Sequence, residues 1–137
     1  MKVILPIKGI KQKSYFCGPA CIEMILYYYG YKVSQKEIGK ILGTYRRRGT
    51  YTSQVIKYLS KYGIVCKKVK NIDVDKYLDK PRPLIIGFPQ HFVLLIGRVK
   101  NYLVILDPAH GRRNIVKRDY LNQAKDYIKI ERIEYEN

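Results

Sequence analysis

The first half of the chain spaces its hydrophobic residues as helices do. Between Pro19 and Tyr29 the apolar side chains fall on one face of a helix. The segment Ser34–Glu37 has the pattern of a capping box, which predicts a short second helix that stops near Gly43. A third helix is predicted from about Ser53 to Tyr62. The first half of the chain is therefore expected to be helical.

The second half changes to short apolar runs that are typical of strands. Five strands are predicted, at Ile64–Val69, Leu84–Phe88, Phe92–Val99, Tyr102–Leu106 and Tyr127–Tyr135. The residues at 98–101 predict a hairpin between the third and fourth of these runs. One or two helical turns are expected from Asp73 to Leu78, and Asp119 is expected to cap another short helix. Helices followed by an antiparallel sheet predict an α+β domain.

Length and composition fit one domain that spans residues 1–137, since 47% of the residues are hydrophobic. No apolar run approaches the 18 residues of a membrane helix, and the apolar start of the chain is too short for a secretory signal. A soluble, cytoplasmic protein is expected. A disulfide framework is then not expected, because disulfides are rare in that compartment, and at least one of the three cysteines is a free thiol, because an odd number cannot all pair.

The chain is strongly basic, with 27 Lys and Arg against 11 Asp and Glu and a net charge of +16. Such a charge attracts anions of several classes: nucleic acid, anionic lipid or acidic peptide. Basic clusters at Arg46–Arg48 and Arg112–Arg113 suggest a nucleic-acid-binding module as an alternative function. The sequence contains no recognisable nucleic-acid motif, so only non-specific binding to nucleic acid is expected.

Cys17 is the candidate nucleophile. Pro19 suits the first turn of a helix, which places Cys17 at the helix N-terminus, where unpaired N–H groups and the helix dipole favour an anion. A thiolate is such an anion and is the reactive form of cysteine. Cys21 and Cys66 are expected in the core. A zinc site from Cys17, Cys21 and histidine is the alternative, although the spacing differs from C-x-x-C, and no cofactor is expected.

His91 and Asp107 are the candidate base and orienting carboxylate. His91 begins one strand of the predicted hairpin and Asp107 ends the other, so the two lie at the same edge of the sheet. A histidine there can take the thiol proton while a carboxylate holds the imidazole in orientation. An Asp-Pro turn would be the purely structural interpretation of Asp107. His110 is expected in the loop beyond Asp107.

Gln12 lies five residues before Cys17. Acyl transfer to a thiolate creates an oxyanion, for which a side-chain amide and the backbone N–H of the nucleophile are suitable donors. The four residues Gln12, Cys17, His91 and Asp107 form an ordered catalytic set.

These motifs resemble the C39 (bacteriocin-processing) peptidases, and within them the stand-alone C39-like branch of the papain-like cysteine peptidases. The matching segments are Gln12–Ala20, Tyr28–Gly30, Gly49–Thr50, Tyr62–Ile64, His91–Leu95 and Asp107–Pro108. The resemblance implies a papain-like fold, Cys17 as nucleophile, His91 as base, Asp107 as orienter and Gln12 in the oxyanion hole. For the transporter-linked members it also implies cleavage of leader peptides after a Gly-Gly pair.

The resemblance thus predicts a thiol peptidase that acts on a peptide or protein substrate, such as a leader peptide, with a separately encoded transporter as an expected partner. Small residues are expected before the scissile bond, with Tyr15 and Phe16 as walls of a narrow groove, and an acidic or amphipathic segment upstream. Two related alternatives use the same groove or residues: a C39-like domain that binds a peptide without cutting it, and a transglutaminase-like acyl transferase.

Overall fold

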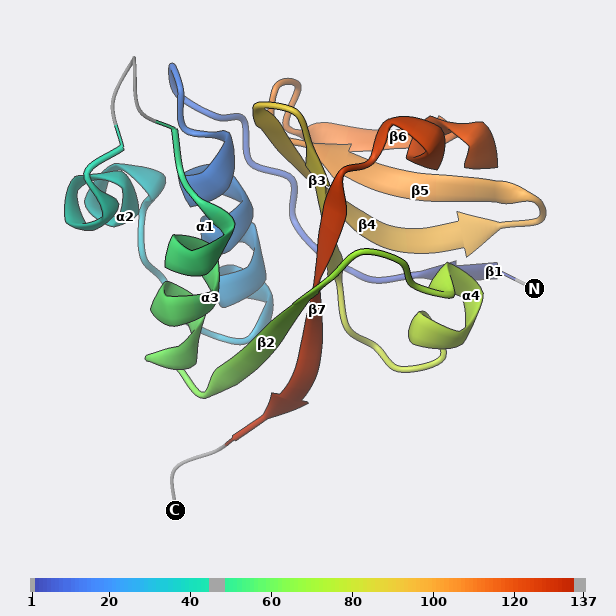
Figure 1. Ribbon diagram of the computed structural model, residues 1–137, viewed down its shortest axis with the longest axis horizontal. Helices are drawn as coiled ribbons and strands as arrows, with labels where there is room; N and C mark the ends of the chain where they lie inside the picture. Colours follow the sequence, from blue (N-terminus) through green and yellow to red (C-terminus); the bar gives the residue numbers. More distant parts are fainter. Residues whose placement is uncertain (1, 45–48, 135–137) are drawn as a thin grey trace.

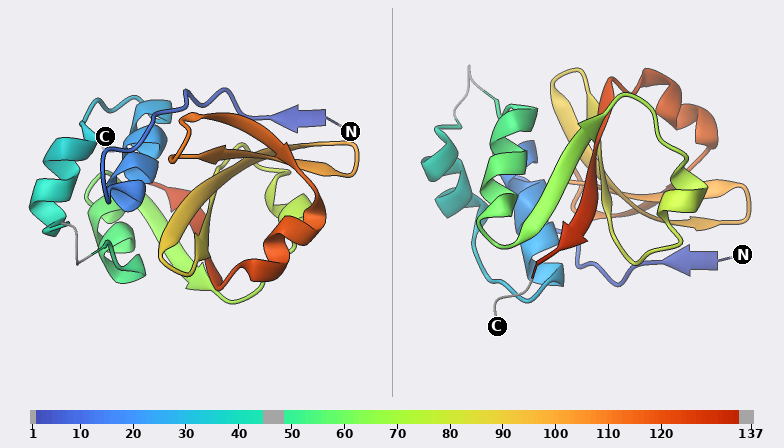
Figure 2. Two further views of the ribbon diagram at one scale, coloured as in Figure 1. Left: turned by 90° about the horizontal axis from the view of Figure 1, so that it is seen from above. Right: turned by 60° about the horizontal axis from the view of Figure 1, so that its bottom comes forward.

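The computed structural model describes residues 2–44 and 49–134. Three helices, α1 (Cys17–Tyr28), α2 (Gln35–Leu42) and α3 (Thr52–Ser60), gather in one half of the molecule, and most of the sheet forms the other half (Figure 1). Helices α1 and α3 pack against the sheet, while α2 packs on the outer side of α1 (Figure 2). This arrangement confirms the predicted α+β architecture.

The ends of α2 follow from its local sequence. The hydroxyl oxygen of Ser34 accepts a hydrogen bond of 3.2 Å from the backbone N–H of Glu37, which satisfies one free donor of the first turn. At the other end, Gly43 takes a left-handed conformation with φ of 69°, which glycine adopts without the strain of a side chain. Both ends agree with the sequence prediction.

The sheet is antiparallel, and the described residues form seven strands in it. The order across it is β2-β7-β3-β4-β5-β6, with β1 paired to β4. The strands are β1 (Lys2–Ile4), β2 (Ile64–Val69), β3 (Leu84–Phe88), β4 (His91–Val99), β5 (Tyr102–Asp107), β6 (Arg112–Val116) and β7 (Asp126–Ile133). A short helix α4 (Val74–Tyr77) and the 3-10 helix η1 (Arg118–Gln123) complete the fold.

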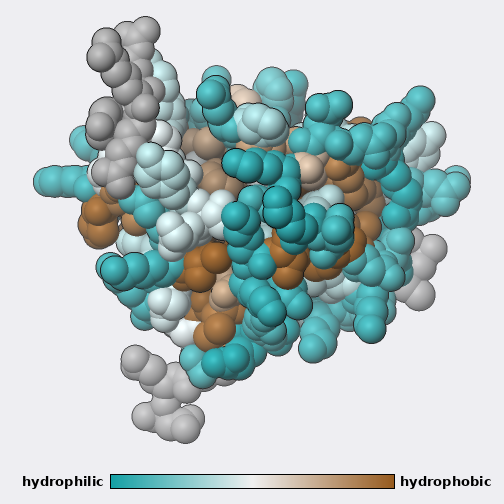
Figure 3. All heavy atoms as spheres, viewed as in Figure 1, coloured by the Kyte–Doolittle hydropathy of each residue, from teal (hydrophilic) through white to brown (hydrophobic). Residues whose placement is uncertain are grey.

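Hydrophobic side chains are buried on both faces of the sheet. The larger core lies between the sheet and helices α1 and α3, and the smaller one lies under α4 and η1. Along β4, Leu94 and Ile96 point to the first core while Val93 and Leu95 point to the second. This double burial explains why β4 is the most apolar run of the sequence. Hydrophilic side chains cover most of the face seen in Figure 3, with smaller hydrophobic areas between them.

Some sequence predictions need correction. Asp119 does not cap η1: the residue before this helix is Lys117, and its side chain makes no capping hydrogen bond. Strands β1 and β6 were not predicted, and the cluster Arg112–Arg113 lies in β6. The cluster Arg46–Arg48 lies outside the described residues. Over residues 2–44 and 49–134, no helix is long and apolar enough to cross a membrane.

Candidate active site

Cys17 is the first residue of α1. The preceding residue, Phe16, makes no side-chain capping hydrogen bond; its backbone carbonyl accepts from the N–H of Ala20 at 2.8 Å, and its own N–H donates to the carbonyl of Lys13 at 3.0 Å. Pro19 has no N–H to leave unsatisfied in the first turn. The first turn of α1 therefore has free N–H groups close to Cys17, and they favour negative charge there.

His91 and Asp107 meet at one edge of the β4–β5 hairpin. His91 Nε2 lies 2.7 Å from Asp107 Oδ1, and the two side chains are 29% and 18% exposed. The same Asp107 oxygen accepts a hydrogen bond of 2.9 Å from the N–H of Ala109, which fixes the carboxylate in the turn. Cys17 lines the same groove as His91 and is the largest contributor to the raised pKa of His91. Because Asp107 occupies Nε2, Nδ1 is the ring nitrogen available to the sulfur.

This environment favours the imidazolium form of His91. The hydrogen bond with Cys17 contributes most, burial opposes it, and the hydrogen bond and charge of Asp107 contribute further, so that the pKa of His91 rises from 6.5 to about 9. The structure thus brings Cys17 and His91 together in one groove and places Asp107 in contact with His91.

Gln12 lies in the same groove as Cys17 and His91. Its backbone N–H donates a hydrogen bond of 2.7 Å to the carbonyl oxygen of Pro108, which ties the segment before α1 to the turn after Asp107. The side-chain Oε1 of Gln12 is buried without a hydrogen-bond partner among the described residues. The side-chain nitrogen is the only donor of this amide, so it is the atom that an oxyanion would require.

The groove has a volume of about 750 Å³ and runs between the two halves of the molecule. Tyr15 and the segment 49–52 line it on the helical side, and the β3–β4 turn with the start of β7 lines it on the sheet side. Tyr15 is 46% exposed and has a positive φ of 66°, an uncommon conformation for a tyrosine.

Only one of the two predicted walls is present. Tyr15 lines the groove, but Phe16 packs its ring against Gly39 of α2, so that a Cβ on Gly39 would lie 2.8 Å from the ring. Thr50 takes part on the helical side instead, because a Cβ on Gly18 would lie 2.6 Å from its Cβ. Gly18 therefore lets the segment around Thr50 approach the residue next to the nucleophile.

The other cysteines and the second histidine lie in different surroundings. Burial raises the pKa of the Cys21 thiol well above its ordinary value, and its sulfur lies 3.6 Å from the carbonyl oxygen of Phe92. Burial also raises the pKa of Cys66 to about 12. Both thiols therefore remain protonated near neutral pH. His110 is exposed in the turn beyond Asp107, as predicted.

Within the described residues, no three His, Cys, Asp or Glu side chains form a group that could hold a metal ion. The zinc alternative therefore has no ligand set in this part of the chain.

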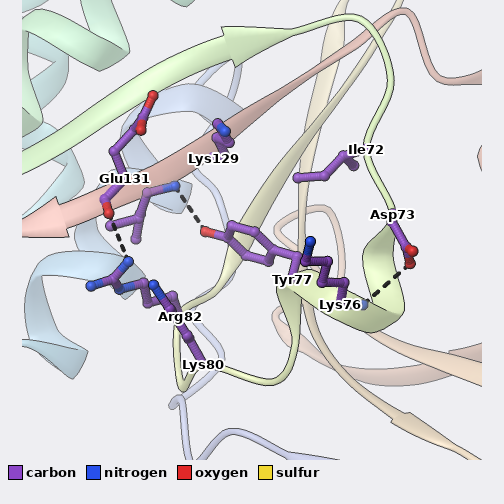
Figure 4. A pocket seen from close by; sticks show the side chains of 9 residues that line it. Ile72, Asp73, Lys76, Tyr77, Lys80, Arg82, Lys129 and Glu131 are labelled. Atoms are coloured by element: carbon purple, nitrogen blue, oxygen red, sulfur yellow. Dashed lines mark hydrogen bonds between the residues drawn. The ribbon is translucent and has the colours of Figure 1, made fainter.

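A second hollow of about 380 Å³ lies between α4 and β7 (Figure 4). The hydroxyl of Tyr77 spans it, donating to the carbonyl of Pro83 at 2.9 Å and accepting from the N–H of Ile130 at 2.8 Å. Its lining contains lysines and an arginine but neither cysteine nor histidine. It is therefore not a candidate for nucleophilic chemistry.

Sequence reasoning missed two residues of the groove, Thr50 as a wall and Asp126 as a buried acid. Thr50 belonged to a family-like segment but carried no chemical signal of its own. Asp126 is a single acid at the start of a strand, and nothing near it in sequence distinguishes it from a surface residue.

Comparison with known proteins gives a match to one family and to several solved structures. The model of the Peptidase C39 family matches residues 9–128. No curated protein matches the chain. The structure is similar to the peptidase domain of Streptococcus ComA, a bi-functional ABC transporter involved in quorum sensing, with a TM-score of 0.77 and 22% identity over 89% of this chain and 96% of that one.

Two further solved structures have the same fold. A double glycine motif protease from an AMS/PCAT transporter, solved with its leader peptide, gives a TM-score of 0.72 and 23% identity, covering 95% of this chain and 99% of that one. A putative C39-like peptidase from Bacillus anthracis gives a TM-score of 0.77 and 16% identity, covering 98% and 100%. These likenesses show the papain-like fold.

Proposed function

Because the chain belongs to the peptidase C39 family, we propose that it is a cysteine peptidase whose triad is Cys17, His91 and Asp107. The observation that carries the proposal is the contact of 2.7 Å between His91 Nε2 and Asp107 Oδ1, with Cys17 and His91 lining the same groove of about 750 Å³.

In the proposed reaction, the Cys17 proton moves to His91, which leaves a thiolate beside an imidazolium. The thiolate sulfur attacks the carbonyl carbon of the scissile peptide bond, and the negative charge moves to the carbonyl oxygen. The side-chain amide of Gln12 and the backbone N–H of Cys17 are the proposed donors to that oxygen. His91 then gives its proton to the leaving nitrogen, so that the C–N bond breaks and an amine departs.

The remaining thioester joins the N-terminal part of the substrate to Cys17. His91, now neutral, takes a proton from a water molecule, whose oxygen attacks the thioester carbon. Collapse of this second tetrahedral intermediate releases a carboxylic acid and expels the Cys17 thiolate beside the protonated His91, which restores the starting pair. Asp107 holds the imidazole in orientation and stabilises its charged form throughout.

The proposed substrate is an extended peptide with small residues before the scissile bond, in the manner of a Gly-Gly leader peptide. Tyr15 and the segment 49–52 support this proposal, because they line the groove together with Cys17, and Thr50 lies close against Gly18, the residue after the nucleophile. A separately encoded transporter is the partner that such a substrate implies. The single domain over residues 1–137 and the cytoplasmic location remain predictions from the sequence.

The test is cleavage of a fluorogenic peptide library that includes Gly-Gly sequences. Cys17→Ala is expected to lower kcat/KM at least ~10³-fold, because the acyl-enzyme can no longer form. Cys66→Ala removes a thiol outside the groove and is the matched control, with activity near that of the unchanged protein. If no peptide is cut but the same peptides bind the protein with and without Cys17, the chain is a peptide-binding domain instead.

A further inference from the structure

Asp126, the first residue of β7, is a buried carboxylate in the wall of the groove. It is only 4% exposed, and among the described residues it is the one charged side chain that is buried. In a chain with a net charge of +16, an acid in the interior of the groove is a distinct local feature.

Few polar groups of the protein stabilise the buried charge of the Asp126 carboxylate. Its contact with a cation is to Lys68 Nζ at 3.6 Å, longer than a hydrogen bond, and the Lys68 side chain is 50% exposed. No hydrogen bond to the Asp126 side chain is present among the described residues. An ionised carboxylate can accept about four hydrogen bonds, and burying one without partners is costly. The groove therefore contains an acceptor that a ligand can satisfy.

The space for this carboxylate is provided by Gly87 on the neighbouring strand. Gly87 pairs with Asp126 across β3 and β7, and a Cβ on Gly87 would overlap Asp126 Oδ1. Since Gly87 does not have a positive φ, this overlap is the reason for a glycine here. The carboxylate thus lies over the backbone of β3 in the groove.

Strand register gives the approximate distance from the proposed base. Gly87 pairs with Phe92, which follows His91, so Asp126 lies two strands away from the base. Two strand spacings are about 10 Å. An extended peptide advances about 3.4 Å per residue, and a lysine or arginine side chain adds several ångströms of reach. A residue about one to three positions from the scissile bond can therefore reach Asp126.

We propose that Asp126 selects a lysine or arginine side chain of the peptide substrate, a preference that rests on the proposed peptidase function. A cationic group neutralises the buried charge and also donates hydrogen bonds to it. A backbone N–H donates a hydrogen bond but leaves the charge in place. The aromatic ring of Phe92 also lines the groove, where it can pack against the apolar stem of a basic residue.

The first experiment measures binding without cleavage, in the Cys17→Ala background. The ligands are fluorescein-labelled Gly-Gly peptides in pairs. In each pair, one peptide has a single lysine at one of the three positions on either side of the proposed scissile bond, and the other has norleucine at that position. At one position, the lysine peptide is expected to bind at least ~10-fold more tightly than its norleucine partner. Adding Asp126→Asn should bring this ratio to about 1, and Asp126→Lys should favour glutamate there.

Asp79→Asn is the matched control, because it removes an exposed acid outside the groove. The double variant Cys17→Ala, Asp79→Asn should show the same preference for lysine over norleucine as the single variant Cys17→Ala. Gly87→Ala is the second variant, since it keeps the charge but displaces the carboxylate, and it should weaken the preference without removing the acid. Circular dichroism melting curves verify that each variant is folded.

The second experiment measures kcat/KM for the same lysine and norleucine peptides with Cys17 present. It distinguishes the proposed role of Asp126 from the proposed peptidase activity. Cleavage with equal lysine-to-norleucine ratios in the unchanged protein and in Asp126→Asn would overturn the role of Asp126 and leave the peptidase intact. Absence of cleavage, together with a lysine preference in binding that Asp126→Asn abolishes, would overturn the peptidase and support the basic-residue site. A preference that Asp126→Asn leaves unchanged in both assays would also refute this role.

Discussion

The charge state of His91 depends on both of its partners. Its pKa is raised from 6.5 to about 9, first by the hydrogen bond with Cys17 and then, against the opposing effect of burial, by Asp107. Cys17→Ala and Asp107→Asn should each lower the pKa of His91. In the double variant only burial remains, so that the pKa should fall below 6.5.

The rise from 6.5 to about 9 also makes a contribution to stability. At about 1.4 kcal/mol for each tenfold change in proton affinity, it corresponds to ~3 kcal/mol. Because the folded protein holds the proton more tightly than the unfolded chain, this contribution is fully present below about pH 6.5. It is lost as the pH rises from 6.5 through about 9. The difference in free energy of unfolding between the unchanged protein and His91→Ala should shrink over that window.

The assay is NMR titration of the imidazole Cε1–H resonance. The chain has two histidines, so His110→Gln leaves His91 as the only one and makes the assignment unambiguous. The midpoint should lie near pH 9 and move down in Cys17→Ala and in Asp107→Asn. A midpoint near 6.5 in the parent, or one that neither substitution moves, would refute the assigned hydrogen-bond line.

Three further predictions concern the thiols, one ion-pair network and the surface charge. Iodoacetamide should label Cys17 faster than the other two cysteines near neutral pH, as mapped by mass spectrometry; equal labelling would contradict an activated thiolate. Asp75 accepts hydrogen bonds of 2.7 Å from Arg98 and of 2.9 and 3.0 Å from Arg118, and these lower its pKa. Because Asp75 is partly exposed, Asp75→Asn should cost only about 1 kcal/mol in urea denaturation, and a loss above about 3 kcal/mol would contradict this weak coupling. DNA should bind weakly at low salt and dissociate near physiological salt; salt-resistant binding to one sequence would favour the nucleic-acid alternative.

Much of the site could be predicted because its parts follow from local rules. Pro19 marks the start of α1 and so places Cys17 at a helix N-terminus. The turn between β4 and β5 brings the start of one strand and the end of the other to the same edge, which brings His91 and Asp107 together. The spacing of hydrophobic residues in these segments identified the helix and the two strands on which the three residues lie.

The parts that could not be predicted depend on contacts between distant residues. Strand β6 is exposed over most of its length and pairs only with β5, so it lacks the alternation that marks a half-buried strand. Phe16 turns away from the groove because Gly39 of α2 leaves room for its ring. The Asp126 carboxylate fits against β3 because Gly87, far away in the sequence, has no side chain.

The central claim is that Cys17 forms a covalent bond to the substrate. The most direct test quenches a cleavage reaction in acid within milliseconds and measures the intact mass, followed by mapping of the modified residue. A thioester that carries the N-terminal part of the peptide is expected on Cys17, and it should be absent from Cys17→Ala. Cleavage by Cys17→Ala at the rate of the unchanged protein would contradict the account.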